Sequence, residues 1–246
     1  MHAVPELRQR EVETYLRVVA ERGTEVGVEA FAFHNLGVFD GGDFAHLLDL
    51  LAAADASASF AFLGRDADEQ ATTVELVDAA GHEVVLHGQR HVACADLPES
   101  LARVNVERGL AAIEAASGVR PRAFFAPLLS TNGATLAALA DNGVEWTLGR
   151  TDAVVPDGLV VVEPEPVVDL ELLMAGHSPA ETFDVITERA ESGGAFLVHP
   201  NLLDYFEATD AFVDWVERFR PVSVGRWLET GGVGLVVDAV RPLAIV

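Results

Sequence analysis

Residues 59–91 read SFAFLGRDADEQATTVELVDAAGHEVVLHGQRH. The apolar run at 59–63 has the length of a buried strand, and residues 68–80 carry a helical pattern that a glycine closes. A second apolar run follows at 83–86 and leads directly into two histidines spaced four residues apart. Strand, helix and strand in this order form a βαβ unit, so this stretch predicts an α/β protein with a parallel sheet.

The same alternation continues along the chain. Strands are predicted at 26–33, 123–126, 145–148, 159–162, 195–199 and 233–237, and helices at 43–55, 98–117, 132–142, 178–192, 207–219 and 223–230. The helix at 178 has the best-marked start, because Ser178 can cap it, Pro179 suits its first position and Glu181 completes a capping box. Repeated βα units favour a barrel or an open doubly wound sheet, and both place functional residues at the carboxyl ends of strands.

Composition excludes several classes of partner. Sixteen residues are Lys or Arg, all of them Arg, and 39 are Asp or Glu, so the formal net charge is −23. Such a charge excludes nucleic acid and anionic membrane surfaces as default partners. An acidic chain without lysine also suggests adaptation to concentrated salt, where screening weakens the repulsion between like charges. The single cysteine, Cys94, forms no internal disulfide and is expected to be a small buried side chain.

The chain is expected to fold as one domain over residues 1–246. An amphipathic helix at 5–22 makes residues 1–23 an N-terminal extension, and residues 26–230 form the core of the domain. No apolar run reaches the length of a membrane span, and residues 1–23 lack the apolar segment of a secretory signal. These features predict a cytoplasmic protein without a membrane span.

Segments around the two histidines resemble the NodB-type polysaccharide deacetylases, the fourth carbohydrate esterase family. Residues 81–91 are similar to its GHE-to-HxxxH segment, and LLDLL at 47–51 with ASFAFLG at 58–64 resembles the signature that precedes it. Downstream, GVRP at 118–121 and FFAP at 124–127 resemble its GxxP and FRxP segments. Asn132, Leu136 and Gly143 continue this likeness, and FLVH at 196–199 is similar to the strand that carries the catalytic histidine.

The resemblance implies a distorted (β/α)7 barrel with a divalent metal ion, usually zinc, at its mouth. By the match of motifs, His87 and His91 are expected to bind the metal, His199 to protonate the leaving amine and Pro127 to contact the substrate. The implied reaction removes the acetyl group from an N-acetylated sugar. A metal-bound water with a base and an acid beside it suits this hydrolysis. A cytoplasmic location would favour a small or lipid-linked glycan precursor over mature cell-wall polymer.

The first motif departs from the family. Its Thr-Phe-Asp-Asp aligns with AFHN at 32–35, so His34 stands in place of the catalytic base and Asn35 in place of the ligand aspartate. The arginine of FRxP, which pairs with the base, aligns with Phe125. The loss of the base aspartate fits the loss of the arginine that pairs with it, because burying an arginine without its anionic partner is costly. Asp40 and Asp43 offer another alignment, but the spacing is poor and Asp43 is more simply a helix N-cap.

Three hypotheses for this altered site remain open. In the first, His34 acts as the base and Asn35 is a neutral oxygen ligand of the metal. In the second, His34, His87 and His91 form a three-histidine zinc site with one open position. In the third, His34 only packs at the end of a strand, and the barrel is an inactive module that binds carbohydrate or protein. Asp169 and His177 are expected in a solvated loop, and His82 at the end of the barrel away from the chemistry.

Overall fold

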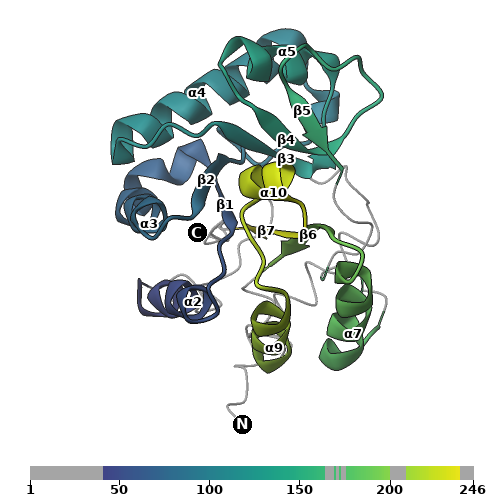
Figure 1. Cartoon of the computed structure of the whole chain (residues 1–246). Helices are drawn as coiled ribbons and strands as arrows, with labels where there is room; N and C mark the ends of the chain where they lie inside the picture. The colour runs from purple at the N-terminus through teal and green to yellow at the C-terminus, as the bar shows by residue number, and fades with distance from the viewer. Residues whose placement is uncertain (1–40, 164–168, 170–171, 173–175, 200–208, 239–246) are drawn as a thin grey trace.

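The computed structural model describes residues 41–163, 169, 172, 176–199 and 209–238, and in these residues seven parallel strands form one curved sheet. The strands are β1 (Ser59–Phe62), β2 (Glu83–Leu86), β3 (Ala123–Ser130), β4 (Trp146–Arg150), β5 (Val160–Val162), β6 (Gly194–Val198) and β7 (Val233–Asp238). Their spatial order is β5-β4-β3-β2-β1-β7-β6. The sheet is nearly closed, and the helices lie around it (Figure 1), which confirms the predicted distorted (β/α)7 barrel.

The helices follow the predicted alternation. They are α2 (Gly41–Ala53), α3 (Ala67–Ala79), α4 (Glu99–Ser117), α5 (Gly133–Asp141), α7 (Pro179–Ala190), α9 (Thr209–Phe219) and α10 (Val224–Thr230). The capping box at the start of α7 is present as predicted, since Ser178 accepts a hydrogen bond from Glu181 N and the Glu181 carboxylate accepts one from Ser178 N. α2 begins at Gly41, so Asp43 lies within the helix and is not its N-cap.

The predicted helix at 5–22 and strand at 26–33 lie outside the described residues. The sheet itself continues through β7 to Asp238, past the predicted end of the core at residue 230. No helix among the described residues is long and apolar enough to cross a membrane.

Alternating side chains on the strands build two apolar layers. On β1, Phe60 and Phe62 face the layer between strands and helices, whereas Ala61 belongs to the layer enclosed by the strands. The inner layer also contains Phe125, Trp146 and other apolar side chains from several strands. This alternation follows from the two-residue period of a strand, and it makes the barrel a packed core with its functional surface at one end.

The amino end of the barrel is closed by the carboxylate of Glu83 on β2. Glu83 Oε2 accepts hydrogen bonds from Ser59 Oγ (2.5 Å) and Gly225 N (3.1 Å), and Oε1 accepts one from Trp146 Nε1 (2.9 Å). Ser59 Oγ in turn accepts a hydrogen bond from Val224 N at 2.8 Å. These contacts tie the start of α10 to three strands, and α10 lies across this end of the barrel in Figure 1.

His82, also at this end, is buried, and its Nδ1 accepts a hydrogen bond from Ala58 N at 3.3 Å. Burial lowers the pKa of His82 from the ordinary value of 6.5. Because the unfolded chain then binds the proton more tightly, the free energy of unfolding should fall as the pH drops below 6.5, by at most about 1.4 kcal/mol per pH unit for this group.

Urea unfolding of the wild type and His82→Asn between pH 5 and 8 tests this expectation. Asn can keep an acceptor near the position of Nδ1 but does not titrate, so the variant should lose less stability than the wild type below pH 6.5. Above that pH the two stability curves should run parallel, offset by the lost contact between His82 and Phe60. Parallel curves over the whole range would show that His82 does not contribute.

Candidate active site

His87 lies directly after β2, at the carboxyl end of the barrel, and is completely buried. Its Nδ1 lies 2.7 Å from the main-chain carbonyl oxygen of Phe125, and its ring stacks on the Phe125 ring with a centroid separation of 4.2 Å. A carbonyl oxygen can only accept, so Nδ1 carries the proton and donates it. The neutral His87 ring therefore presents the lone pair of Nε2.

The charge state of His87 follows from the same surroundings. Burial lowers its pKa to about 3, against an opposing effect of the hydrogen bond to Phe125, and the charge that His199 can carry lowers it further. His87 is thus neutral at physiological pH. Its Nε2 is buried and has no hydrogen-bond partner among the residues that the structure describes. A buried acceptor nitrogen on a neutral, oriented imidazole is the form in which histidine binds a metal ion.

His91 lies beside His87, although a four-residue spacing by itself brings two side chains together only on a helical turn. The two ring centroids are 4.8 Å apart at an interplanar angle of 64°, and His91 is 8% exposed. The two histidines do not lie on a helix, since residues 87–93 form a loop that leads into a 3-10 turn at Cys94–Asp96. Cys94 is buried, as expected, and burial raises the pKa of its thiol to about 12, so it is no thiolate ligand or nucleophile.

The residues present fit part of a metal site. His87 and His91 can supply two imidazole ligands, but the described part of the chain contains no group of three or more His, Cys, Asp or Glu residues that could hold an ion. The sequence assigned the remaining positions to His34 and Asn35, and both lie outside the described residues. The structure therefore leaves the three hypotheses for the first motif as they stood.

Asp169 corrects the expectation of a solvated loop. Its side chain is fully buried, and its two carboxylate oxygens hold His199 at the end of β6. Asp169 Oδ2 accepts a hydrogen bond from His199 N, and Oδ1 accepts one from His199 Nδ1, both at 2.7 Å. The pair fixes the position of the residue and the rotation of its ring, so the protonated Nδ1 faces Asp169. His177 is exposed, as expected for a solvated loop.

The pair also connects the two edge strands of the sheet. Asp169 follows β5 in sequence and His199 follows β6, and the described residues show no strand pairing between β5 and β6. Among the described residues these hydrogen bonds therefore link the two margins of the barrel. Because His199 also affects the pKa of His87, the two histidines share one electrostatic environment at the carboxyl end of the strands.

The end of β3 contributes an unusual backbone. Leu128 and Leu129 have positive φ angles of 56° and 54°, and the register between β3 and β4 shifts between Phe125 and Ser130. Leucine in this left-handed region costs on the order of 1 kcal/mol or more, so the surrounding structure must hold it there. Pro127, the predicted substrate contact, is buried directly before them, and its role remains a prediction.

Comparison with known proteins gives one matching family model and several structures of similar fold. Residues 36–147 match a family model described as polysaccharide deacetylase. A pseudoenzyme of carbohydrate esterase family 4 from Bacillus anthracis is 18% identical, with a TM-score of 0.58, and the match covers 79% of this chain and 64% of that one. A protein classed as a polysaccharide deacetylase from Mycobacterium smegmatis is 20% identical, with a TM-score of 0.63 over 97% of this chain and 91% of that one.

A third structure, a family 4 carbohydrate esterase from Streptomyces lividans in complex with acetate, is 20% identical, with a TM-score of 0.55 over 72% of this chain and 82% of that one. No curated protein sequence matches the chain. This chain spans less than two thirds of the Bacillus anthracis pseudoenzyme. At these identities the structural similarities establish the shared barrel fold, whereas the chemistry has to be argued from the site.

Proposed function

We propose, from the premise that this chain contains a polysaccharide deacetylase domain of the NodB type, that it is a metal-dependent hydrolase that removes the acetyl group from an N-acetylated sugar. The observation that carries the proposal is the state of His87, a buried neutral imidazole whose Nδ1–H donates a hydrogen bond to the Phe125 carbonyl oxygen and whose Nε2 is left as an acceptor. His91 beside it supplies a second imidazole. Zinc is the proposed ion, since it accepts histidine ligands readily.

The described residues would divide the chemistry between them. A divalent ion held by His87 and His91 would lower the pKa of a bound water and polarise the acetamide carbonyl. His199, held by Asp169 through Nδ1, can present a proton on Nε2 to the leaving amine. The two hydrogen bonds to the Asp169 carboxylate prevent the ring from turning. The general base that takes a proton from the water would be His34, which the sequence alone suggests for this role.

Metal content tests the proposal. The wild type, purified in concentrated salt, should contain about one zinc ion per chain. His87→Ala should lose it, because the variant lacks the oriented Nε2. His177→Ala is the matched control, since this histidine is exposed and is not one of the proposed ligands, and the substitution should leave the metal content unchanged. Acetate release from N-acetylglucosamine oligomers then measures the activity, which the loss of the ion should abolish.

A second candidate is an inactive barrel that binds carbohydrate or another protein. Two observations favour it: the first motif carries His34 and Asn35 in place of two aspartates, and the fold is shared with a pseudoenzyme of the same carbohydrate esterase family. Metal content and acetate release separate the two candidates. A wild type with neither a bound ion nor activity would overturn the hydrolase proposal and leave binding as the function.

A further inference from the structure

The loop that joins His87 to His91 is held by one residue of α4. Asn105 Oδ1 accepts a hydrogen bond from Arg90 N at 2.9 Å, and the main-chain oxygen of Asn105 accepts one from Gln89 N at 2.8 Å. Two consecutive amides between the histidines thus bind a single asparagine. Because both amides are fixed, the path of the backbone from one imidazole to the other is fixed as well.

Two glycines allow this close approach. Gly88 has a φ of +84°, and a Cβ there would lie 2.7 Å from Asn105 Nδ2. Gly109, one turn further along α4, would place a Cβ 2.9 Å from Gln89 N. A side chain at either position would push the loop away from α4, so both glycines and Asn105 serve the same contact.

Asn105 is an unfavourable choice for the stability of α4 alone. It is 7% exposed and lies on the buried stripe of the helix, between Ala102 and Gly109. Asparagine has a lower helix propensity than alanine or leucine, and a buried amide requires partners for its polar atoms. Its side chain holds the turn between the two histidines through Arg90 N, and it also contacts the Cys94 thiol.

We propose that Asn105 is a positioning residue, which sets the geometry of the His87 and His91 imidazoles through the amides of Gln89 and Arg90. The part of this inference that concerns metal affinity rests on the proposed function. The part that concerns the two rings does not, because their separation is a property of the metal-free protein. Residues that orient metal ligands typically change affinity by about 10- to 100-fold when removed.

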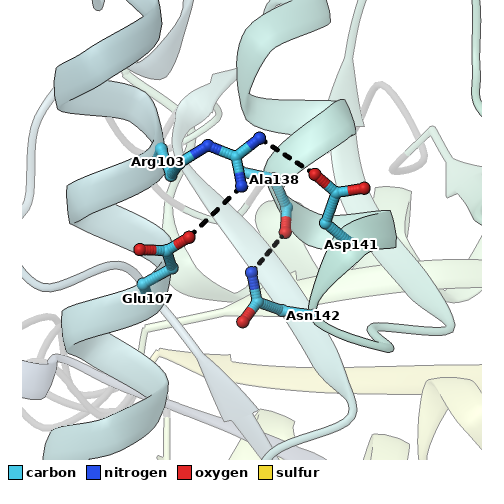
Figure 2. A network of polar contacts seen from close by, with 5 residues as sticks. All are labelled: Arg103, Glu107, Ala138, Asp141 and Asn142. Atoms are coloured by element: carbon cyan, nitrogen blue, oxygen red, sulfur yellow. Dashed lines mark hydrogen bonds and ion pairs between the residues drawn. The ribbon is translucent and has the colours of Figure 1, made fainter.

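The first test compares Asn105→Ala with Asn142→Ala. Asn142 also makes a side-chain hydrogen bond to a main-chain oxygen, from Nδ2 to Ala138 O at 2.8 Å, but it lies in the polar network between α4 and α5, together with Arg103, Glu107 and Asp141 (Figure 2). The dissociation constant of Co²⁺, read from its visible absorption, should rise about 10- to 100-fold in Asn105→Ala. It should stay unchanged in Asn142→Ala.

A second pair of variants separates the effect of displacing Asn105 on Co²⁺ binding from the effect of backbone strain. Gly88→Ala and Gly81→Ala both put alanine at a positive φ, of +84° and +80°, but a Cβ at Gly81 meets nothing within 4 Å. Both should lose stability because of the positive φ, and Gly88→Ala should lose more, because its Cβ would also lie 2.7 Å from Asn105 Nδ2 and 3.0 Å from Arg90 O. Only Gly88→Ala should weaken Co²⁺ binding, because only its Cβ would displace Asn105.

A third measurement needs no metal. The nuclear Overhauser effect between the His87 and His91 rings, whose centroids lie 4.8 Å apart, should be present in the metal-free wild type and in Asn142→Ala, and lost in Asn105→Ala. A wild type that binds no Co²⁺ would overturn the proposed function, and this ring contact would still decide the role of Asn105. If the contact persists in a folded Asn105→Ala, Asn105 is only a structural residue and the inference is wrong.

Discussion

Asp169→Asn is expected to reduce the kcat for deacetylation by roughly 10²- to 10⁴-fold while leaving the protein folded, the range that general acid catalysis contributes. The substitution keeps the shape of the side chain and removes its charge. Asp169 accepts two hydrogen bonds, from the main-chain N and the Nδ1 of His199. Asparagine has a single acceptor oxygen, so it can satisfy only one of these donors.

The tautomer of His199 explains the size of this effect. The amide oxygen of the asparagine must face His199 N, which can only donate, so its NH₂ group faces Nδ1. Nδ1 then has to accept, and the protonated imidazole, which carries a proton on both nitrogens, is disfavoured. His199 thereby loses the form that can protonate a leaving amine. The expected result is a fall in kcat much larger than any change in KM.

Steady-state acetate release at saturating substrate measures this change. Asp184→Asn, which alters an exposed aspartate on α7, is the matched control and should retain the wild-type rate. Circular dichroism confirms that each variant is folded. An Asp169→Asn variant that is folded and as active as the wild type would show that His199 is not the proton donor of this barrel.

Most of the fold could be predicted from local patterns. The stretch from β1 to β2 contains its own strand, helix and strand signals, and the helix at Pro179 is marked by a capping box that the structure contains. The prediction was less accurate at the end of β3, which continues to Ser130 past the expected end at residue 126. Nothing in the sequence Pro-Leu-Leu-Ser signals two leucines at positive φ, because leucine by itself disfavours that conformation.

Some residues of the candidate site could also be predicted from the sequence, and others could not. His87, His91 and His199 could be found because each follows an apolar strand, and parallel strands bring their carboxyl ends together. Asp169 was misjudged because the prolines around it indicate a loop, whereas the structure places it in a helical conformation, and burial of its carboxylate depends on a partner 30 residues away. Asn105 carried one usable signal, a polar residue on an otherwise apolar helix stripe, whose partner only the fold reveals.

Glu83→Ala is expected to lower the free energy of unfolding by about 3 to 5 kcal/mol. The substitution removes a carboxylate that accepts three hydrogen bonds, and it leaves the three donors without an acceptor. Ser59 and Trp146 are nearly fully buried, so water cannot replace the lost acceptor freely. For a chain of this length, the melting temperature should fall by roughly 2–4 °C for each kcal/mol. Gly225 N would lose its acceptor too, which should loosen α10 from the barrel.

Urea unfolding measures the change, and Glu114→Ala is the control. Glu114 is also a glutamate that accepts a hydrogen bond, from Arg120, but both of these side chains are more than 40% exposed, so its loss should cost less than about 1 kcal/mol. The contrast tests burial directly, because both variants remove one carboxylate and its hydrogen bonds. A Glu83→Ala variant no less stable than Glu114→Ala would mean that the amino end of the barrel is closed by apolar packing, with Trp146 and Val224 sufficient to hold α10 in place.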